Sequence, residues 1–170
     1  MTKALFGAVS VLALTAGAAL AEQSFNRIAS FPVVKNMAEG EDQNRETSPE
    51  IIAATGDGMT LVYTDSPLGV VGMIDIRNPA DPQPLGNIPL DGEPTSVVVV
   101  GPKAYVGVNT SESYTEPSGY LAVININSKT IEKTCNLGGQ PDSVAVDAIG
   151  SFLAIAILRE RARPILEATP

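Results

Sequence analysis

The sequence predicts an all-β protein, an incomplete β-propeller of about two and a half four-stranded blades after a helical signal peptide. The first observation is a repeated phrase: "DGEPTSVVVV" at 91–100 returns as "GGQPDSVAVD" at 138–147, which places Pro94 and Pro141 47 residues apart. A third copy begins with "SPEIIAAT", and its proline, Pro49, stands 92 residues before Pro141. A repeat of this length is typical of propeller blades rather than of helical solenoids.

The second observation is the content of each repeat. Four short runs rich in Val and Ile are separated by Gly, Pro, Asp and Asn, which is the pattern of strands joined by tight turns. The expected strands lie at 50–55, 60–64, 70–76 and 85–90 in the first repeat and at 96–100, 104–108, 120–126 and 131–137 in the second. We expect a polar connector at 22–47, blades at 48–90 and 91–137, and the start of a third blade at 138–157. The alternative fold, a β-sandwich, rarely repeats its own sequence.

The first 21 residues predict a secretory signal peptide. Lys3 precedes an apolar run at 4–14 that is short for a bilayer span, and Ala19 and Ala21 form a small-x-small cleavage site. Glu22 is then the first residue of the mature protein, which we expect to be periplasmic or secreted. The alternative is an uncleaved anchor helix. We expect no membrane span in the mature chain.

Composition excludes several classes of function. The chain carries 11 Lys and Arg residues against 19 Asp and Glu residues, a net charge of −8, so its surface repels phosphate backbones and anionic membranes. We therefore expect no nucleic-acid partner. The sequence contains no histidine, which excludes a Ser-His-Asp triad and a His-ligated zinc within these residues. Cys135 is the single cysteine, so it has no partner for an internal disulfide, and we expect a buried, inert thiol.

The loops at one end of the blades carry the candidate site. In a four-stranded meander, the link between the second and third strands and the link between blades emerge at the same end. Asp65 and Asn109 occupy matching places in successive blades, and Glu93 and Asp142 lie in the links between blades. Carboxylate and amide oxygens around a channel are ligands that calcium takes, so these residues predict a calcium site. The alternative is that they only cap strands and turns. No motif identifies a catalytic residue.

The series "TSPEI", "YTDSP", "DGEPTSV" and "GGQPDSVAV" resembles a family of exported bacterial propellers with YVTN-type repeats, from about Phe25 to Ile157. Members are labelled phytase-like esterase or alkaline phosphatase and are similar to choice-of-anchor surface proteins. The resemblance implies an exported binding or scaffold propeller, here as a truncated copy. It also implies an alternative for the full-length protein, a metal-dependent phosphoester or ester hydrolase whose acidic loops hold a metal-activated water.

The last residues break the repeat pattern. The segment "LRERARPILEATP" at 158–170 shows no strand alternation and carries three arginines. One possible set of codons for Arg159 to Arg163, translated one base later, encodes an acidic segment that contains Asn. The resemblance leads us to expect an acidic, Asn-containing loop after this strand. We therefore predict a frameshifted or truncated gene product, and the alternative is a genuine basic tail. A propeller closes with about four to eight blades, so we expect the partners to be missing propeller blades or a second copy of this chain.

Overall fold

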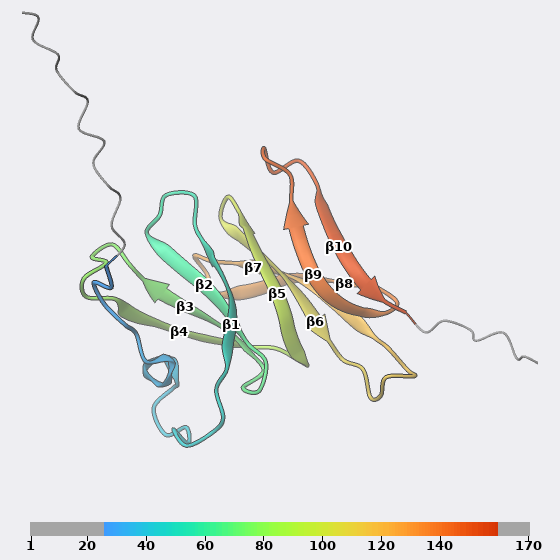
Figure 1. Cartoon of the computed structure of the whole chain (residues 1–170), viewed down its shortest axis with the longest axis horizontal. Helices are drawn as coiled ribbons and strands as arrows, with labels where there is room; N and C mark the ends of the chain where they lie inside the picture. Colours follow the sequence, from blue (N-terminus) through green and yellow to red (C-terminus); the bar gives the residue numbers. More distant parts are fainter. Residues whose placement is uncertain (1–25, 160–170) are drawn as a thin grey trace, which may run out of the picture.

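The computed structural model describes residues 26–159, which form three antiparallel sheets (Figure 1). The predicted signal peptide, with its cleavage site at Ala19 to Glu22, and residues 160–170 of the predicted tail lie outside the described residues. Within 26–159, the only helical element is a single 3-10 turn, η1 (Val33–Asn36), and the other elements are ten strands. That part of the chain therefore offers no helix capable of crossing a membrane.

The ten strands form two complete four-stranded meanders and one hairpin. Sheet 1 contains β1 (Pro49–Ala54), β2 (Thr60–Asp65), β3 (Val70–Asp75) and β4 (Gln83–Pro89). Sheet 2 contains β5 (Glu93–Val100), β6 (Lys103–Asn109), β7 (Gly119–Asn125) and β8 (Thr130–Asn136). Sheet 3 contains β9 (Gln140–Val146) and β10 (Leu153–Leu158). The predicted fold class, an all-β incomplete propeller, is confirmed.

The three sheets stand face to face along the molecule. The first strands β1, β5 and β9 lie on one side, and the last strands β4 and β8 lie behind them (Figure 1). Strand β5 lies against β1 and β2, and β9 lies against β5 and β6. The backbones of successive sheets therefore approach each other most closely at the first strand of the later sheet, as the blades of a propeller do around its axis.

The core lies between sheets 1 and 2. Side chains alternate between the two faces of a strand, so every second residue of each sheet points to this interface. The buried cluster contains Val62, Val71, Met73 and Ile88 from sheet 1 and Val97, Ala104, Val106, Val108, Ala122, Ile124 and Ile126 from sheet 2. Burying one such side chain fully stabilises the fold by about 1.5–3 kcal/mol, which is enough, summed over the cluster, to hold the two sheets together.

Proline begins each contact between sheets. Pro94 and Pro141 are fully buried, and each is followed by a register shift of one residue in its strand pairing. The carbonyl oxygen of Pro94 accepts a hydrogen bond from Ser66 Oγ of sheet 1 at 2.7 Å, and that of Pro141 accepts one from Thr95 Oγ1 of sheet 2 at 2.9 Å. Pro49 starts sheet 1 with the same shift but is exposed. The repeated phrase is therefore the element that docks one sheet onto the preceding sheet.

Glycine in sheet 2 makes room for the second of these prolines. A side chain on Gly119 would overlap the ring of Pro141 and the carbonyl oxygen of Val108, and one on Gly107 would lie 3.1 Å from Pro141 Cβ. Both glycines belong to sheet 2, in β7 and β6. The ring of Pro141 therefore sits in a recess that exists only because two facing positions have no side chain.

The expected polar connector is partly a packed element. Residues 38–47 are mostly exposed, but Asn36 in η1 is only 3% exposed. Its Nδ2 donates to the Tyr63 hydroxyl and to the carbonyl oxygen of Met73, both at 2.9 Å, and its Oδ1 accepts from the Gly86 amide at 3.0 Å. Met73 and Gly86 lie at the register shift between β3 and β4. Asn36 thus satisfies backbone groups at that shift and fastens residues 28–36, which we call the strap, to sheet 1.

Substitution of Gly119 tests the recess. The Gly119→Ala substitution should lower the free energy of unfolding by about 2 kcal/mol or more, because the new methyl group overlaps groups that belong to two packed sheets. Gly56→Ala is the matched control, since nothing lies within 4 Å of a side chain there. Urea denaturation measures both. Equal stabilities of the two variants would contradict the proposed seating of Pro141.

Substitution of Asn36 tests the strap. Asn36→Ala leaves the half-buried Gly86 amide hydrogen and the buried Met73 carbonyl oxygen without this partner, so the free energy of unfolding should fall by about 2–3 kcal/mol. Asn127→Ala, at an exposed turn position, should change it by less than about 0.5 kcal/mol. Thermal and urea melts of the two variants give the comparison. A wild-type melt for Asn36→Ala would show that the strap does not contribute to the fold.

Candidate functional site

A polar hollow of about 290 Å³ lies where sheets 2 and 3 meet. Three strand ends position it: the start of β5, the end of β6 and the start of β9. The loop at 110–118, between β6 and β7, closes one side and emerges at the same end of the sheets as the β2–β3 link (Figure 1). The lining residues are Glu93, Asn109, Ser111, Glu112, Ser113, Tyr114 and Gln140.

Two of the predicted site residues meet in this hollow. Glu93 and Asn109 are directly opposite each other in the β5–β6 ladder, and Asn109 Nδ2 donates to Glu93 Oε2 at 3.2 Å. Asn109 Oδ1 accepts from the Ser111 amide at 2.9 Å, which fixes the orientation of the side-chain amide. The pair therefore presents a carboxylate beside an amide whose position is already determined.

Hydrogen bonds within the 110–118 loop hold its shape. The Thr110 amide donates to the Ser118 carbonyl oxygen at 3.1 Å, and Ser111 Oγ accepts from the Ser118 amide at 3.0 Å. Tyr114, at the tip, is 93% exposed. The loop therefore brings Glu112, Ser113 and Tyr114 to the hollow in a fixed arrangement. The order of strands in a meander predicts a site at this end of the sheets. Tyr114 is not part of that prediction, because its only signal in the sequence is that it is an aromatic residue within a polar loop.

Asp65 ends β2 as Asn109 ends β6, but its carboxylate is buried. Its side chain is fully inaccessible, and Oδ1 accepts from the amides of Ser48 at 2.9 Å and Leu68 at 3.3 Å. Oδ2 is buried and finds no hydrogen-bond partner among the described residues. Asp65 therefore holds the chain that enters β1 and caps the β2–β3 turn, and it does not line the polar hollow.

Asp142 lies elsewhere again, exposed at the register shift of β9. The structure thus brings Glu93 and Asn109 together, with Gln140, and places Asp65 and Asp142 outside the hollow. Among residues 26–159, no three Asp, Glu or Cys side chains gather closely enough to hold a metal ion. A cation in the hollow would need the two carboxylates, the neighbouring amide oxygens and water together. Cys135, which was expected to be buried, is half-buried on β8.

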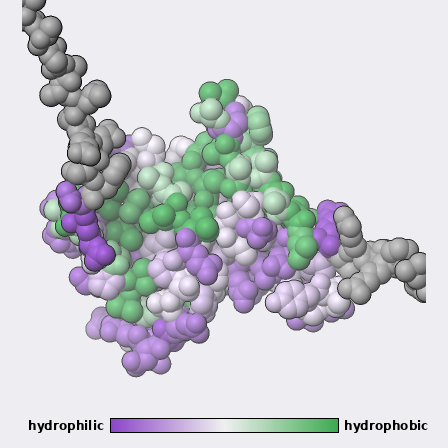
Figure 2. Space-filling view, viewed as in Figure 1, coloured by the Kyte–Doolittle hydropathy of each residue, from purple (hydrophilic) through white to green (hydrophobic). Residues whose placement is uncertain are grey.

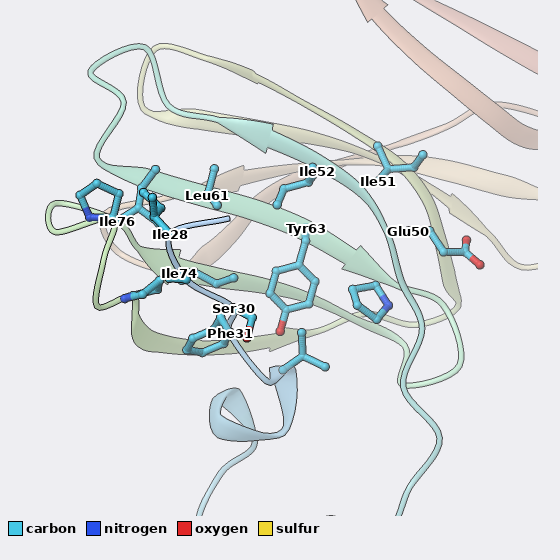
Figure 3. A pocket seen from close by; sticks show the side chains of 15 residues that line it. Ile28, Ser30, Phe31, Glu50, Ile51, Ile52, Leu61, Tyr63, Ile74 and Ile76 are labelled. Carbon is cyan, nitrogen blue, oxygen red and sulfur yellow. The ribbon is translucent and has the colours of Figure 1, made fainter. Parts of the chain in front are cut away.

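A second hollow, apolar and about 530 Å³ in volume, lies between the strap and sheet 1 (Figure 3). Ile28 and Phe31 of the strap face Leu61, Tyr63 and Ile74 of the sheet across it. The Tyr63 ring occupies the space above Gly72, where any side chain would overlap it. Burial raises the pKa of the Tyr63 phenol, with a smaller contribution from the Asp65 charge. This groove runs along the face of sheet 1 that points away from sheet 2.

The chain is similar in fold to solved structures. It matches no protein-family model and no curated protein. Among solved structures, it is similar to Kuenenia stuttgartiensis hydrazine synthase, a protein that contains a β-propeller, with a TM-score of 0.53 and 22% sequence identity. The match covers 64% of this chain and 29% of the hydrazine synthase chain, so this chain spans less than a third of that protein. At this identity the likeness shows the fold alone.

Substitution of Asp65 tests whether the hydrogen bonds of its side chain support the fold. Asp65→Ala should lower the free energy of unfolding by about 2 kcal/mol, because the amides of Ser48 and Leu68 lose their acceptor. Asp65→Asn retains one carbonyl oxygen for those amides and should stay within about 1 kcal/mol of wild type. Urea denaturation tests the pair. An equal loss for both variants would mean that the charge of Asp65, rather than its hydrogen bonds, supports the fold.

Proposed function

We propose that this chain is an exported, propeller-type binding or scaffold protein, periplasmic or secreted, and that the polar hollow is its ligand site. The observation that carries the proposal is the meeting of Glu93, Asn109 and Gln140 at adjoining strand ends. These groups come from two sheets, so the junction between sheets fixes their spacing. Loops and strand ends on a rigid scaffold are where binding sites of propellers and similar folds are usually found.

The chemistry of the hollow favours a ligand with positive charge or with several hydrogen-bond donors. Glu93 and Glu112 supply carboxylates and Gln140 supplies a side-chain amide, whereas the Asn109 amide already donates to Glu93 Oε2 and accepts from the Ser111 amide. Calcium is the simplest such ligand, since it takes six to eight oxygen ligands and accepts water among them. The net charge of −8 attracts cations toward the surface at long range. Calcium is therefore the probe that we would use first.

Calorimetric titration with calcium chloride tests the site. The wild-type chain should bind calcium, and Glu93→Gln should weaken binding about tenfold or more, because it removes a charged oxygen while preserving the size of the side chain. Asp81→Asn is the matched control: it removes the same charge from an exposed turn of sheet 1 outside the hollow. No binding by the wild type, or equal weakening in both variants, would contradict the proposal.

The alternative function, a metal-dependent phosphoester or ester hydrolase, is supported only by the sequence resemblance. It predicts turnover of an aryl phosphate that a chelator abolishes and that calcium restores. The same Glu93→Gln variant should then lose turnover, whereas Asp81→Asn should keep it. Calcium binding without turnover would favour the binding protein over the hydrolase.

A further inference from the structure

The polar hollow carries negative charge that the chain itself does not balance. Glu93 stands at the start of β5 and Glu112 belongs to the 110–118 loop, so two carboxylates reach the hollow from different elements. Among the described residues, neither carboxylate takes part in an ion pair. Arg159, which follows β10, instead donates to the Leu137 carbonyl oxygen at 3.3 Å. A ligand with positive charge would therefore find two carboxylates still available to it.

The oxygens of the hollow are better arranged for N–H donors than for a metal ion. Asn109 donates to Oε2 of Glu93, so Oε1 is the oxygen that can accept from a ligand. Glu112 and Gln140 add acceptors from the loop and from sheet 3. Calcium takes six to eight oxygen ligands, and within 26–159 no three acidic side chains gather closely enough to hold a metal ion. A cation with several N–H donors would use these oxygens directly, whereas calcium would draw most of its ligands from water.

Tyr114 adds an aromatic ring to the same lining. It is 93% exposed at the tip of the loop, so most of its ring surface is open to a ligand. The Glu116 amide donates to the Ser113 carbonyl oxygen at 3.2 Å, which closes a turn around Tyr114. The face of an aromatic ring attracts cations, and a guanidinium, which is planar, can stack on the ring while its edge donates hydrogen bonds. The hollow therefore offers both partners that a guanidinium uses.

The size and polarity of the hollow limit the ligand further. Its volume is about 290 Å³, near the lower end, about 300 Å³, of the pockets that take small molecules. The 110–118 loop is hydrophilic, whereas hydrophobic residues gather over the β9–β10 hairpin (Figure 2). The hollow therefore suits the polar end of one side chain rather than a large or apolar molecule.

We propose that the polar hollow binds the guanidinium of an arginine side chain within a peptide. The inference rests on the proposed function, because it names the ligand class of the same site. Glu93 and Glu112 accept hydrogen bonds from the guanidinium, and the Tyr114 ring stacks on its plane. A peptide fits better than free arginine, because the α-carboxylate of the free amino acid would meet an acidic lining on a chain of net charge −8.

N-acetylarginine methylamide, which has one positive charge and no carboxylate, is the probe for this site. An NMR titration of the purified chain should show saturable shifts of the amides of Glu93, Gln140 and the 110–118 loop. The corresponding citrulline derivative has the same shape without the charge, so it should bind about tenfold more weakly or less. Equal affinities for the two derivatives would overturn the proposal. Free L-arginine that bound as tightly as the blocked form would overturn a peptide as the source of the guanidinium.

Substitution of Tyr114 tests the stacking contact. Tyr114→Ala should raise the dissociation constant for the arginine derivative about twofold to fivefold, since it removes the ring. Tyr114→Phe keeps the ring and should bind like the wild type. Both variants should keep the wild-type affinity for calcium, because the ring supplies no charged oxygen. An unchanged affinity of Tyr114→Ala for the arginine derivative would contradict the proposed contact, and the exposure of Tyr114 means that both variants should fold.

Comparison of the two ligands separates this inference from the function on which it rests. The wild-type chain should bind both calcium and the arginine derivative, and Glu93→Gln should weaken binding of the derivative about tenfold while Asp81→Asn leaves it unchanged. Calcium binding without binding of the arginine derivative would overturn the inference and leave the proposed function in place. Binding of neither ligand would overturn both. Arginine binding that Glu93→Gln does not weaken would place the guanidinium outside the hollow and would also overturn the inference.

Discussion

Sheets 2 and 3 are each placed by a contact that starts with a buried proline. Pro94 and Pro141 lack an amide hydrogen, so they begin a strand without leaving a buried donor unsatisfied. Their carbonyl oxygens accept hydroxyl hydrogen bonds from the sheet before. The register shift that follows then turns the first strand across its neighbour. The relative positions of the sheets, and of everything at their ends, depend on this contact.

The polar hollow is a consequence of that contact. Glu93 immediately precedes Pro94, and Gln140 immediately precedes Pro141. The residues that dock two successive sheets therefore also set the separation of a carboxylate and an amide at the edge of the hollow. A ligand that bridges Glu93 and Gln140 would add a link between sheets 2 and 3, and its binding energy would stabilise the junction.

Much of the fold could be predicted from the sequence because its signals are local and repeated. Proline, glycine and runs of Val recur at a fixed spacing, and this spacing located all the strands of sheets 1 and 2. The meeting of Glu93 and Asn109 followed from the same logic, since both stand at strand ends on one side of a meander. These inferences needed only the order of strands and the direction in which each runs.

The remaining features depend on contacts that have no periodic signal. Asn36 makes side-chain hydrogen bonds to residues that lie between 27 and 50 positions away in the sequence. The segment that contains Asn36 has no pattern that distinguishes it from an ordinary connector. Asp65 and Asn109 occupy matching strand ends, but the chain entering β1 covers Asp65, whereas Asn109 faces a hollow. Equivalent positions in a repeat therefore need not share a function. The sequence predicted where polar groups gather but not which of them are buried.

The exchange rate of one amide hydrogen tests the central claim most directly. The Val144 amide donates to Ser96 Oγ across the junction between sheets 3 and 2, at 3.1 Å and out of contact with water. Native-state hydrogen exchange followed by NMR should find this amide protected to nearly the same degree as the β6 ladder amides, because it opens only when sheet 3 leaves sheet 2. If Val144 exchanged as fast as an exposed loop while β6 remained protected, sheet 3 would not be seated by its proline, and the account of the junction would be wrong.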